Sequence, residues 1–485
     1  MIGLELESQV TADPVNGSGA TRVEHDLLGD RAVPADAYYG VHTLRAVENF
    51  PISGTPISIY PELIHALASI KEAAARTNHL LGLLDERRTN AIAQACEELR
   101  QGRLHDQFIV DVIQGGAGTS TNMNANEVIA NRALEILGHA KGDYEQLSPN
   151  DHVNVSQSTN DVYPTALKIA TYRGVHGLID ALQVLRHAFE RKAAEFADVL
   201  KMGRTQLQDA VPMTLGQEFS AYAAMIEEDE HRLHEAVGLV CEINMGATAI
   251  GTGITAHPSY AGMVCEQLSG ITGIALVTAP NLVEATQDCG AFVQISGVLK
   301  RVAVKLSKIC HDLRLLSSGP RAGLNEINLP AAQAGSSIMP GKVNPVIPEV
   351  VNQIAYEVIG NDVTVSFAAE AGQLQLNAFE PIIAHSLFKS IQHLRNGCLT
   401  LAERCVDGIT ANRERMRAMV HDSIGIVTAL NPYIGYKNAT KVASEAHASG
   451  RSVFDIVLEM GLMSRQQLEA VLNPEELTRP QPIRW

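Results

Sequence analysis

The placement of proline constrains the fold of this 485-residue chain more than any other feature of its sequence. Twenty prolines occur, yet five long intervals contain none. A proline inside a helix removes a hydrogen bond and breaks or kinks the helix. Long helices are therefore predicted in the proline-free intervals, which run from residue 164 to 212, 212 to 258, 280 to 320, 348 to 381 and 381 to 432.

Apolar residues recur at helical spacing in two of these intervals. Repeats of three and four residues place side chains on one face of a helix. The first interval carries Leu178, Ile179, Leu182, Leu185, Phe189, Ala193 and Phe196, and the third carries Phe292, Ile295, Val298, Leu299, Val302, Leu306, Ile309 and Leu313. We find no convincing alternating strand pattern and no strand–helix–strand rhythm, so the predicted fold class is all-α.

This pattern predicts three helical domains. A central bundle of long helices spans residues 161–415, between an N-terminal helical domain (21–160) and a small C-terminal helical domain (416–485). Residues 1–20 are small and polar, and we expect a mobile tail there. Helices this long bury several faces at once, which is typical of an oligomer.

Composition excludes several classes of function. Lys and Arg total 38 and Asp and Glu total 54, so the formal charge is −16. Such an acidic chain is not expected to bind nucleic acid or an anionic membrane non-specifically. The seven cysteines are odd in number, widely spaced and without a CxxC pair. They predict reduced thiols in the cytoplasm and neither a disulfide framework nor a zinc site.

Four polar loops carry the residues best suited to chemistry, and each is predicted to open a helix. A possible capping box, Asn124-x-x-Glu127, follows the first loop, and Thr214-x-x-Gln217 follows the third. Pro164 would lie in the first helical turn after the second loop. The loops are Gly115–Ser120, Ser156–Asp161, Gly203–Gln206 and Gly335–Asn344.

Free N–H groups at the start of a helix bind anions, so four such loops rich in Ser, Thr and Asn could surround a small carboxylate. The simpler interpretation is that these residues only cap helices. The fourth loop departs most clearly from that interpretation, because capping does not require the glycine-flanked pair Ser336-Ser337 or the nearby Lys342.

The fourth loop, Gly335-Ser-Ser-Ile-Met-Pro-Gly-Lys-Val-Asn-Pro345, resembles the motif of the aspartase/fumarase superfamily. The segments Gly118–Asn124 and Ser156–Pro164 resemble the other two substrate-binding blocks of that superfamily. The likeness runs from about Arg22 to Pro474, nearly the whole chain.

Within the superfamily, the chain is most similar to the aspartate ammonia-lyases. Class II fumarases typically have a tryptophan-containing block near the first of the diagnostic stretches and a histidine where Gln206 stands, although some aspartases also have histidine there. The stretches that carry this likeness are Asp36–Thr43, Gly115–Thr119, Gly203–Met213 and Leu430–Asn438.

The resemblance implies roles for particular residues. Ser336 would be the base that removes the Cβ proton, and the backbone N–H of Ser337 would help to hold the developing enediolate. Lys342 and Asn344 would bind a substrate carboxylate, and Arg45 is a further candidate for that role. The rest of the pocket would be lined by Thr119, Ser158, Thr159, Asn160, Thr205 and Gln206.

The implied activity is reversible conversion of L-aspartate to fumarate and ammonia without an organic cofactor or a metal ligand set. The family assembly is a homotetramer around twenty long helices. Residues near 160 and 205 would stand at opposite ends of one long helix, so we expect active sites shared between subunits. A fumarate hydratase and a non-catalytic structural homologue are the alternatives.

Overall fold

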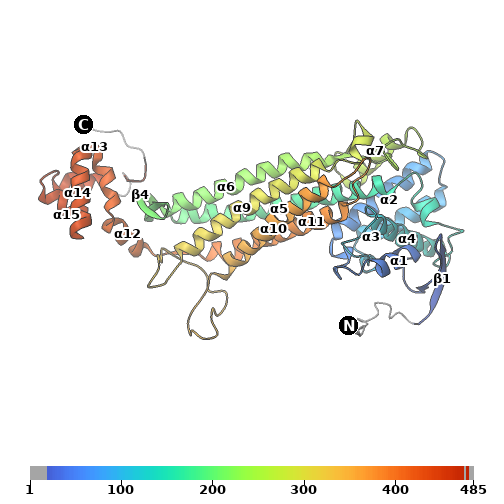
Figure 1. Cartoon of the computed structure of the whole chain (residues 1–485), viewed down its shortest axis with the longest axis horizontal. Coiled ribbons are helices and arrows are strands. Elements are labelled where there is room, and N and C mark those ends of the chain that lie inside the picture. Colours follow the sequence, from blue (N-terminus) through green and yellow to red (C-terminus); the bar gives the residue numbers. More distant parts are fainter. Residues whose placement is uncertain (1–18, 474–476, 480–485) are drawn as a thin grey trace, which may run out of the picture. The chain divides into compact units, whose positions relative to one another are not determined.

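The computed structural model describes residues 19–473 and 477–479. Most of the predicted N-terminal tail therefore lies outside the described residues. Helices dominate the described chain, as predicted (Figure 1). The helices are α1 (Val41–Asn49), α2 (Pro61–Leu80), α3 (Glu86–Arg100), α4 (Thr119–Ile136), α5 (Thr159–Glu195), α6 (Leu215–Val237), α7 (Tyr260–Thr272), α8 (Leu282–Ala285), α9 (Gly290–Leu316), α10 (Val346–Glu370), α11 (Glu380–Arg404), α12 (Arg413–Asp422), α13 (Asn431–Ile434), α14 (Tyr436–Ser449), α15 (Val453–Glu459) and α16 (Arg465–Val471).

Short strands are also present, although the sequence pattern did not indicate them. Within residues 19–473 they form four two-stranded sheets, in which the pairs are β1–β2, β3–β4, β5–β6 and β7–β8. The strands are β1 (Thr21–Asp26), β2 (Gly29–Pro34), β3 (Leu200–Thr205), β4 (Gln208–Thr214), β5 (Glu242–Ile243), β6 (Val277–Thr278), β7 (Ile327–Asn328) and β8 (Thr410–Ala411). Both longer sheets are antiparallel hairpins, and each has strands too short for alternation to stand out.

The proline-free intervals hold the long helices. The helix predicted from the first interval is α5, which has 37 residues and begins earlier than expected, so Pro164 lies inside it. The apolar residues predicted to form one face of α9 are all buried, from Phe292 to Leu313. Helix α6 begins as the sequence indicated, since Gln217 N donates to Thr214 Oγ1 (3.1 Å) and Thr214 N donates to Gln217 Oε1 (3.0 Å).

The chain divides into two compact units. Unit 1 contains residues up to 176, 233–298 and 360–391, and unit 2 contains residues 177–232, 299–359 and 392–485. Helices α5, α6, α9, α10 and α11 each contribute residues to both units.

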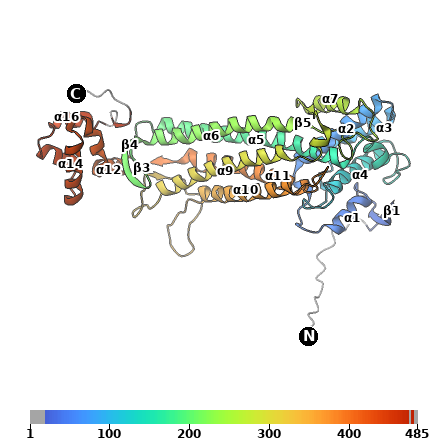
Figure 2. The same cartoon turned by 45° about the horizontal axis from the view of Figure 1, so that its top comes forward.

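The core of unit 2 is built on long helices that lie side by side (Figures 1 and 2). Between α5 and α6, Phe189 and Phe196 pack on Phe219, with ring centroids 5.8 and 5.4 Å apart. A separate apolar cluster fills the C-terminal part of unit 2, where Leu430, Val442, Val457 and Leu468 are buried.

Unit 1 packs its shorter helices against one another, mainly α2 against α3 and α7, and α3 against α4. Its buried residues include an alanine-rich face of α2, from Ala66 to Ala75. Among the described helices, none combines the length and the apolar character that a membrane-spanning segment requires.

Candidate active site

The first polar loop packs directly on the start of α5. Gly116 and Gly118 have φ of +88° and +90°, and Ala117 between them has φ of +55°, a run that favours glycine. A Cβ on Gly118 would lie 2.3 Å from Cγ of Tyr163 in α5. The loop delivers Thr119 to the first position of α4, where its Oγ1 donates to Gly116 O (2.8 Å) and remains exposed.

The second polar loop is held by buried hydrogen bonds. Asp161 accepts from Ser158 N (3.0 Å), Gly246 N (3.2 Å) and Thr248 N (3.0 Å). Because Pro164 has no N–H, the carbonyl of Asn160 lacks its helical partner, and Asn244 Nδ2 donates to it instead (3.0 Å). Ser158, Thr159 and Asn160 are therefore fixed at the start of α5 while their side chains stay partly exposed.

The structure brings these two loops together. Asn122, in the first turn of α4, donates from Nδ2 to Thr159 Oγ1 at the start of α5 (3.1 Å). Beneath this contact lies Lys71 of α2, whose Nζ donates to Asn122 Oδ1 (2.7 Å), Asn154 Oδ1 (2.9 Å) and Gln157 Oε1 (2.9 Å). Burial lowers the pKa of Lys71 to about 7 and raises that of Asp161 to about 7.

Lys71 and its amide partners were missed by the sequence reasoning. The signal available was a lysine among the small and apolar residues of α2, beside Glu72, together with three asparagines, Asn122, Asn124 and Asn126, on α4. A buried lysine needs partners, but the sequence does not say that residues 122, 154 and 157 supply them.

The third polar loop does not open a helix, which corrects the prediction. Thr205 and Gln208 pair at the end of the β3–β4 hairpin. Gln206 and Leu207 form its two-residue turn, with φ of +54° and +63°, the backbone of a type I′ turn. Glycine or asparagine usually occupies such positions, so the sequence did not indicate a hairpin here. Thr205 and Gln206 are exposed at the tip.

A buried ion cluster holds this hairpin in unit 2. Glu326, which is fully buried, accepts from Arg204 Nη1 (2.6 Å) and lies 3.2 Å from Lys201 Nζ. Lys201 also donates to Glu218 (2.5 Å). Because Glu326 precedes the fourth loop in the chain, the cluster fixes the segment from which that loop emerges.

The fourth loop is exposed, and it is held mainly by hydrogen bonds between its two ends. Gly335 N donates to Lys342 O (2.8 Å), and Asn344 Nδ2 donates to Gly335 O (2.7 Å). Within the loop, Ser336 Oγ accepts from Ile338 N (3.1 Å) and Met339 N (2.9 Å). Ser337 and Lys342 are exposed, and so are the apolar side chains Ile338, Met339 and Val343.

Arg45, the further carboxylate candidate, is already paired in this structure. Its Nε and Nη2 donate to the two oxygens of Asp26 (2.8 Å each), and Nη2 also donates to Gly29 O (2.9 Å). This pairing lowers the pKa of Asp26. Arg45 thus fastens the turn of the β1–β2 hairpin to α1.

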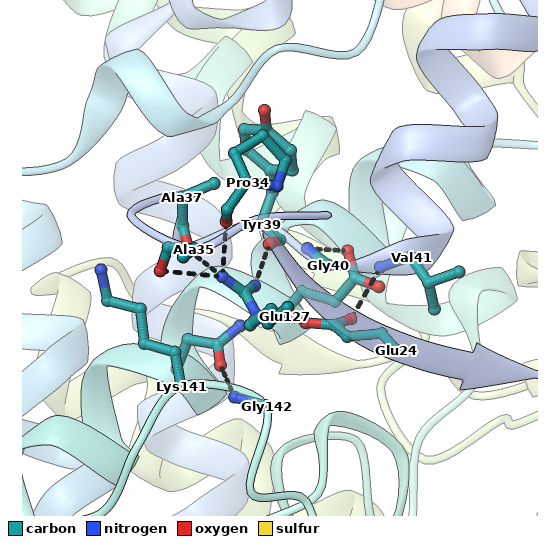
Figure 3. Close-up of polar contacts among 12 residues, drawn as sticks. Glu24, Pro34, Ala35, Ala37, Tyr39, Gly40, Val41, Glu127, Lys141 and Gly142 are labelled. Carbon is teal, nitrogen blue, oxygen red and sulfur yellow. Dashed lines mark hydrogen bonds and ion pairs between the residues drawn. The ribbon is translucent and has the colours of Figure 1, made fainter. Parts of the chain in front are cut away.

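Helix α1 is held at its start by two buried carboxylates (Figure 3). Glu127 accepts from Gly40 N (2.8 Å), His42 N (2.8 Å) and Thr43 N (3.1 Å), and Glu24 accepts from Val41 N (2.8 Å). Glu127 therefore caps α1 across the fold, so the predicted capping box with Asn124 is wrong. Both residues lie inside α4, which begins at Thr119.

The predicted site residues fall into two groups. Unit 1 contains Arg45, Thr119, Ser158, Thr159 and Asn160. Unit 2 contains Thr205, Gln206, Ser336, Ser337, Lys342 and Asn344. Within unit 1 the hydrogen bond between Asn122 and Thr159 and the close approach of Gly118 to the Tyr163 ring join two of the predicted segments. The roles of all these residues remain predictions.

Comparison with known proteins identifies the family. A lyase family model matches residues 29–360, and a model of the fumarase C C-terminus matches residues 426–479. Aspartate ammonia-lyases from Helicobacter pylori (strain J99 / ATCC 700824) and Escherichia coli (strain K12) are 58% and 56% identical. The alignments cover 95% and 96% of this chain and 98% and 97% of the relatives.

Solved structures agree with these relatives. A fumarate lyase:delta crystallin from Brucella melitensis bound to cobalt has a TM-score of 0.93 at 56% identity, covering 95% of this chain and all of that one. A class II fumarase from Schistosoma mansoni has a TM-score of 0.91 at 34% identity, covering 96% of this chain and all of that one. The chain belongs to the lyase family of the aspartase/fumarase superfamily, as its motifs indicated.

Proposed function

We propose that this protein catalyses the reversible deamination of L-aspartate to fumarate and ammonia. The observation that carries the proposal is the identity of 56–59% to aspartate ammonia-lyases over nearly the whole chain. Two features of the structure support it: helix starts that present Ser, Thr and Asn, and an exposed serine loop with a lysine.

The proposed reaction begins with proton abstraction. The Ser336 alkoxide takes a proton from Cβ, and the C–H electron pair moves onto the adjacent carboxylate to give an enediolate. The pair then returns to form the double bond while the C–N bond breaks, and ammonia leaves with the electrons of that bond. Ser336 afterwards releases its proton, so fumarate and ammonia are the only products.

A serine hydroxyl is a weak acid, so its alkoxide needs stabilisation. Ser336 Oγ already accepts two backbone N–H bonds, from Ile338 and Met339, and such bonds favour an ionised acceptor. When substrate binds, we expect the loop to close and exclude water, which strengthens these interactions. Gly341, with φ of +80° and open space around it, would allow that movement.

The enediolate carries two negative charges and needs oriented donors. In the proposal, Lys342 and Asn344 bind one carboxylate, and Ser337 N–H, Thr119, Ser158 and Thr159 face the other. These donors are protein groups, so we propose that no organic cofactor takes part. Asn160, Thr205 and Gln206 would hold the leaving nitrogen.

The alternative reaction is hydration of fumarate. Hydroxide leaves malate poorly without a general acid, and the amide of Gln206 cannot supply a proton. We therefore expect strong preference for aspartate over malate. The test compares kcat/KM for the two substrates by the absorbance of fumarate, with product identity checked after incubation of fumarate with and without ammonia. Comparable kcat/KM values would refute the proposal.

We further propose a homotetramer with active sites shared between subunits, working in the cytoplasm. Helix α5 separates Ser158 from Thr205 in the chain, and its 37 residues correspond to about 56 Å. Apolar side chains on α10 also stay exposed in the single chain: Val363 is 51% and Phe367 71% exposed. An exposed apolar stripe of this kind fits contact with another subunit.

Mixing two inactive variants tests the shared site. Ser336→Ala and the double variant Thr159→Ala with Thr205→Ala should each be inactive alone. Unfolded and reassembled together, they should regain activity that depends on the mixing ratio, because some sites then carry no substitution. If mixed tetramers of confirmed mass stay inactive, the site lies within one chain.

A further inference from the structure

Lys71 is a buried cation that the proposed mechanism does not use. Its side chain is fully buried in unit 1, and its three N–H groups donate to amide oxygens of Asn122, Asn154 and Gln157. Three donors are present only in the ammonium form, so this geometry selects the charged lysine. None of the three acceptors carries a charge that would cancel it.

The ammonium determines which way the amide of Asn122 points. Only an oxygen can accept from Lys71, so Asn122 Oδ1 faces the lysine and Nδ2 must face the opposite side. There Nδ2 donates to Thr159 Oγ1 (3.1 Å) and to Asn154 Oδ1 (3.2 Å). Thr159 Oγ1 therefore accepts a hydrogen bond from the protein, through the amide of Asn122.

An oxygen that accepts from Asn122 keeps its own proton for another partner. Thr159 lies at the start of α5 and is partly exposed, while Asn122 and Lys71 are buried behind it. The hydroxyl hydrogen can thus point away from the protein interior. An anion at the helix start would receive a hydrogen bond of the kind that is strengthened by charge.

We propose that Lys71 is a positioning residue, which acts through Asn122 to hold Thr159 as a hydrogen-bond donor to the substrate carboxylate. This inference rests on the proposed function. As negative charge builds up on the enediolate, the hydroxyl of Thr159 and the amide of Asn122 form a line of dipoles that ends at the ammonium. Dipoles aligned in this way in a water-excluded site stabilise developing charge.

Asp161 does not compensate Lys71 by direct contact. Its carboxylate accepts three backbone N–H bonds, from Ser158, Gly246 and Thr248. The charge of Asp161 opposes the effect of burial on the pKa of Lys71, so this carboxylate influences the lysine at a distance. The lysine's hydrogen bonds remain directed at the amides.

The sharpest test is Asn122→Asp, a substitution that changes almost no atoms. A carboxylate would still accept from Lys71, so the variant should fold. It has no N–H to offer, however, so Thr159 would have to donate to residue 122 and turn its proton away from the substrate. We expect kcat/KM for aspartate to fall at least 10-fold, and thermal denaturation checks that the variant is folded, because the hydrogen bond to Asn154 is lost as well.

Asn126→Asp is the matched control. Asn126 is also buried on α4, one turn further along, and donates to Asn154 Oδ1 (3.1 Å) and not to Thr159. The Asn126→Asp substitution adds the same negative charge nearby. Thr159 can still accept from Asn122 and keep its own proton for the substrate. Equal losses in the two variants would mean that added charge explains the effect, and the proposal would be overturned.

A second set of variants tests the proposal in case Asn122→Asp does not fold. Lys71→Met, Thr159→Val and the double variant are compared, with Lys168→Met as a control for loss of a buried lysine elsewhere in unit 1. If Lys71 acts through Thr159, the double variant loses no more kcat/KM than Thr159→Val alone. Losses that multiply would show that Lys71 acts independently of Thr159 and overturn the proposal.

The two proposals can fail separately. If the unsubstituted enzyme does not deaminate aspartate, the proposed function is wrong. Binding of fumarate, measured by calorimetry, then replaces turnover as the readout. A Kd for fumarate that is at least 10-fold weaker in Asn122→Asp than in Asn126→Asp supports the inference, and equal values contradict it.

Discussion

The loops at the start of α4 and α5 differ from the serine loop at residues 335–344 in how they are held. In the first region every predicted site residue stands on a buried framework of amides, carboxylates and close-packed glycine. In the second, Ser336 is anchored by its own loop, and the neighbouring Ile338 is 83% exposed. In the proposed mechanism this difference would separate two tasks: the first region would supply donors of fixed direction, and the serine loop would close over the substrate.

Removal of the Ser336 hydroxyl should have the largest effect on turnover. Ser336→Ala is expected to lower kcat at least about 100-fold, because a general base is lost. The unfolding free energy should change by less than about 0.5 kcal/mol, since the loop is exposed.

Ser337→Ala is the control for that change, because the proposed role of Ser337 uses its backbone N–H, which alanine retains. Steady-state kinetics and chemical denaturation measure both variants. If Ser336→Ala keeps more than a tenth of the parent kcat, Ser336 is not the base.

Replacing one glycine by alanine in each region should lower the unfolding free energy by different amounts. Gly118→Ala introduces a Cβ 2.3 Å from the Tyr163 ring in a backbone with φ of +90°. Left-handed strain and overpacking together predict a loss of about 2 to 5 kcal/mol. Gly341→Ala meets open space and should lose only about 1 to 2 kcal/mol, from φ alone.

Urea denaturation of both glycine variants measures the difference. Equal losses would mean that the loop before α4 can relax away from Tyr163, and the contrast in rigidity would then disappear.

Unit 1, which holds the loops at the start of α4 and α5, also contains a buried carboxyl, Glu380, whose ionisation should affect the unfolding free energy. Burial raises the pKa of Glu380 to about 8, against the opposing effect of Lys168. Between pH 5 and 8 the folded protein keeps a proton that the unfolded chain releases, so stability falls as pH rises, by up to about 1.4 kcal/mol per pH unit.

Glu380→Gln should remove that contribution and flatten the curve of unfolding free energy against pH. Glu459→Gln, at an exposed position of α15, serves as the control for the loss of a surface carboxyl. An unchanged slope in Glu380→Gln would mean that Glu380 ionises as an ordinary carboxyl does.

The smallest expected effect is measured on the unsubstituted protein, by limited proteolysis. Trypsin should cut the unmodified protein after Lys342 sooner than after Lys141, which is partly buried and donates to Asp36 O (2.6 Å). Fumarate should slow the cut at Lys342, because a closed loop is protected. Mass spectrometry of timed digests measures both rates. A faster cut at Lys141 would contradict the assignment of mobility to the serine loop.

The sequence was informative wherever local signals determine structure. Proline-free intervals and three- and four-residue repeats located α5 and α9, and Thr214-x-x-Gln217 located the start of α6. The β3–β4 hairpin escaped prediction because its turn, Gln206-Leu207, lacks the residues that normally indicate one. Glu127 was misassigned because a contact distant in sequence, with Gly40 to Thr43, outweighed the local capping pattern.

In the candidate site, too, motifs within one segment could be recognised in the sequence, whereas contacts between distant segments could not. Resemblance to the superfamily named Thr159 and Ser336, and the structure shows what surrounds them. The role of Lys71 was missed because its acceptors, Asn122, Asn154 and Gln157, meet only after α2, α4 and the loop before α5 have packed. Periodicity and spacing along the chain do not predict contacts between segments that are so distant in sequence.

The turn at Gln206-Leu207 bears on how this protein could be engineered for heat resistance. Asn-Gly would suit the type I′ backbone far better, since non-glycine residues with positive φ cost about 1 to 2 kcal/mol each. A design guided by stability alone would replace the pair and remove the Gln206 amide. If Gln206 holds the leaving nitrogen as proposed, the chain keeps an unfavourable backbone for the sake of one side chain, and at this turn thermal tolerance and activity are expected to oppose each other.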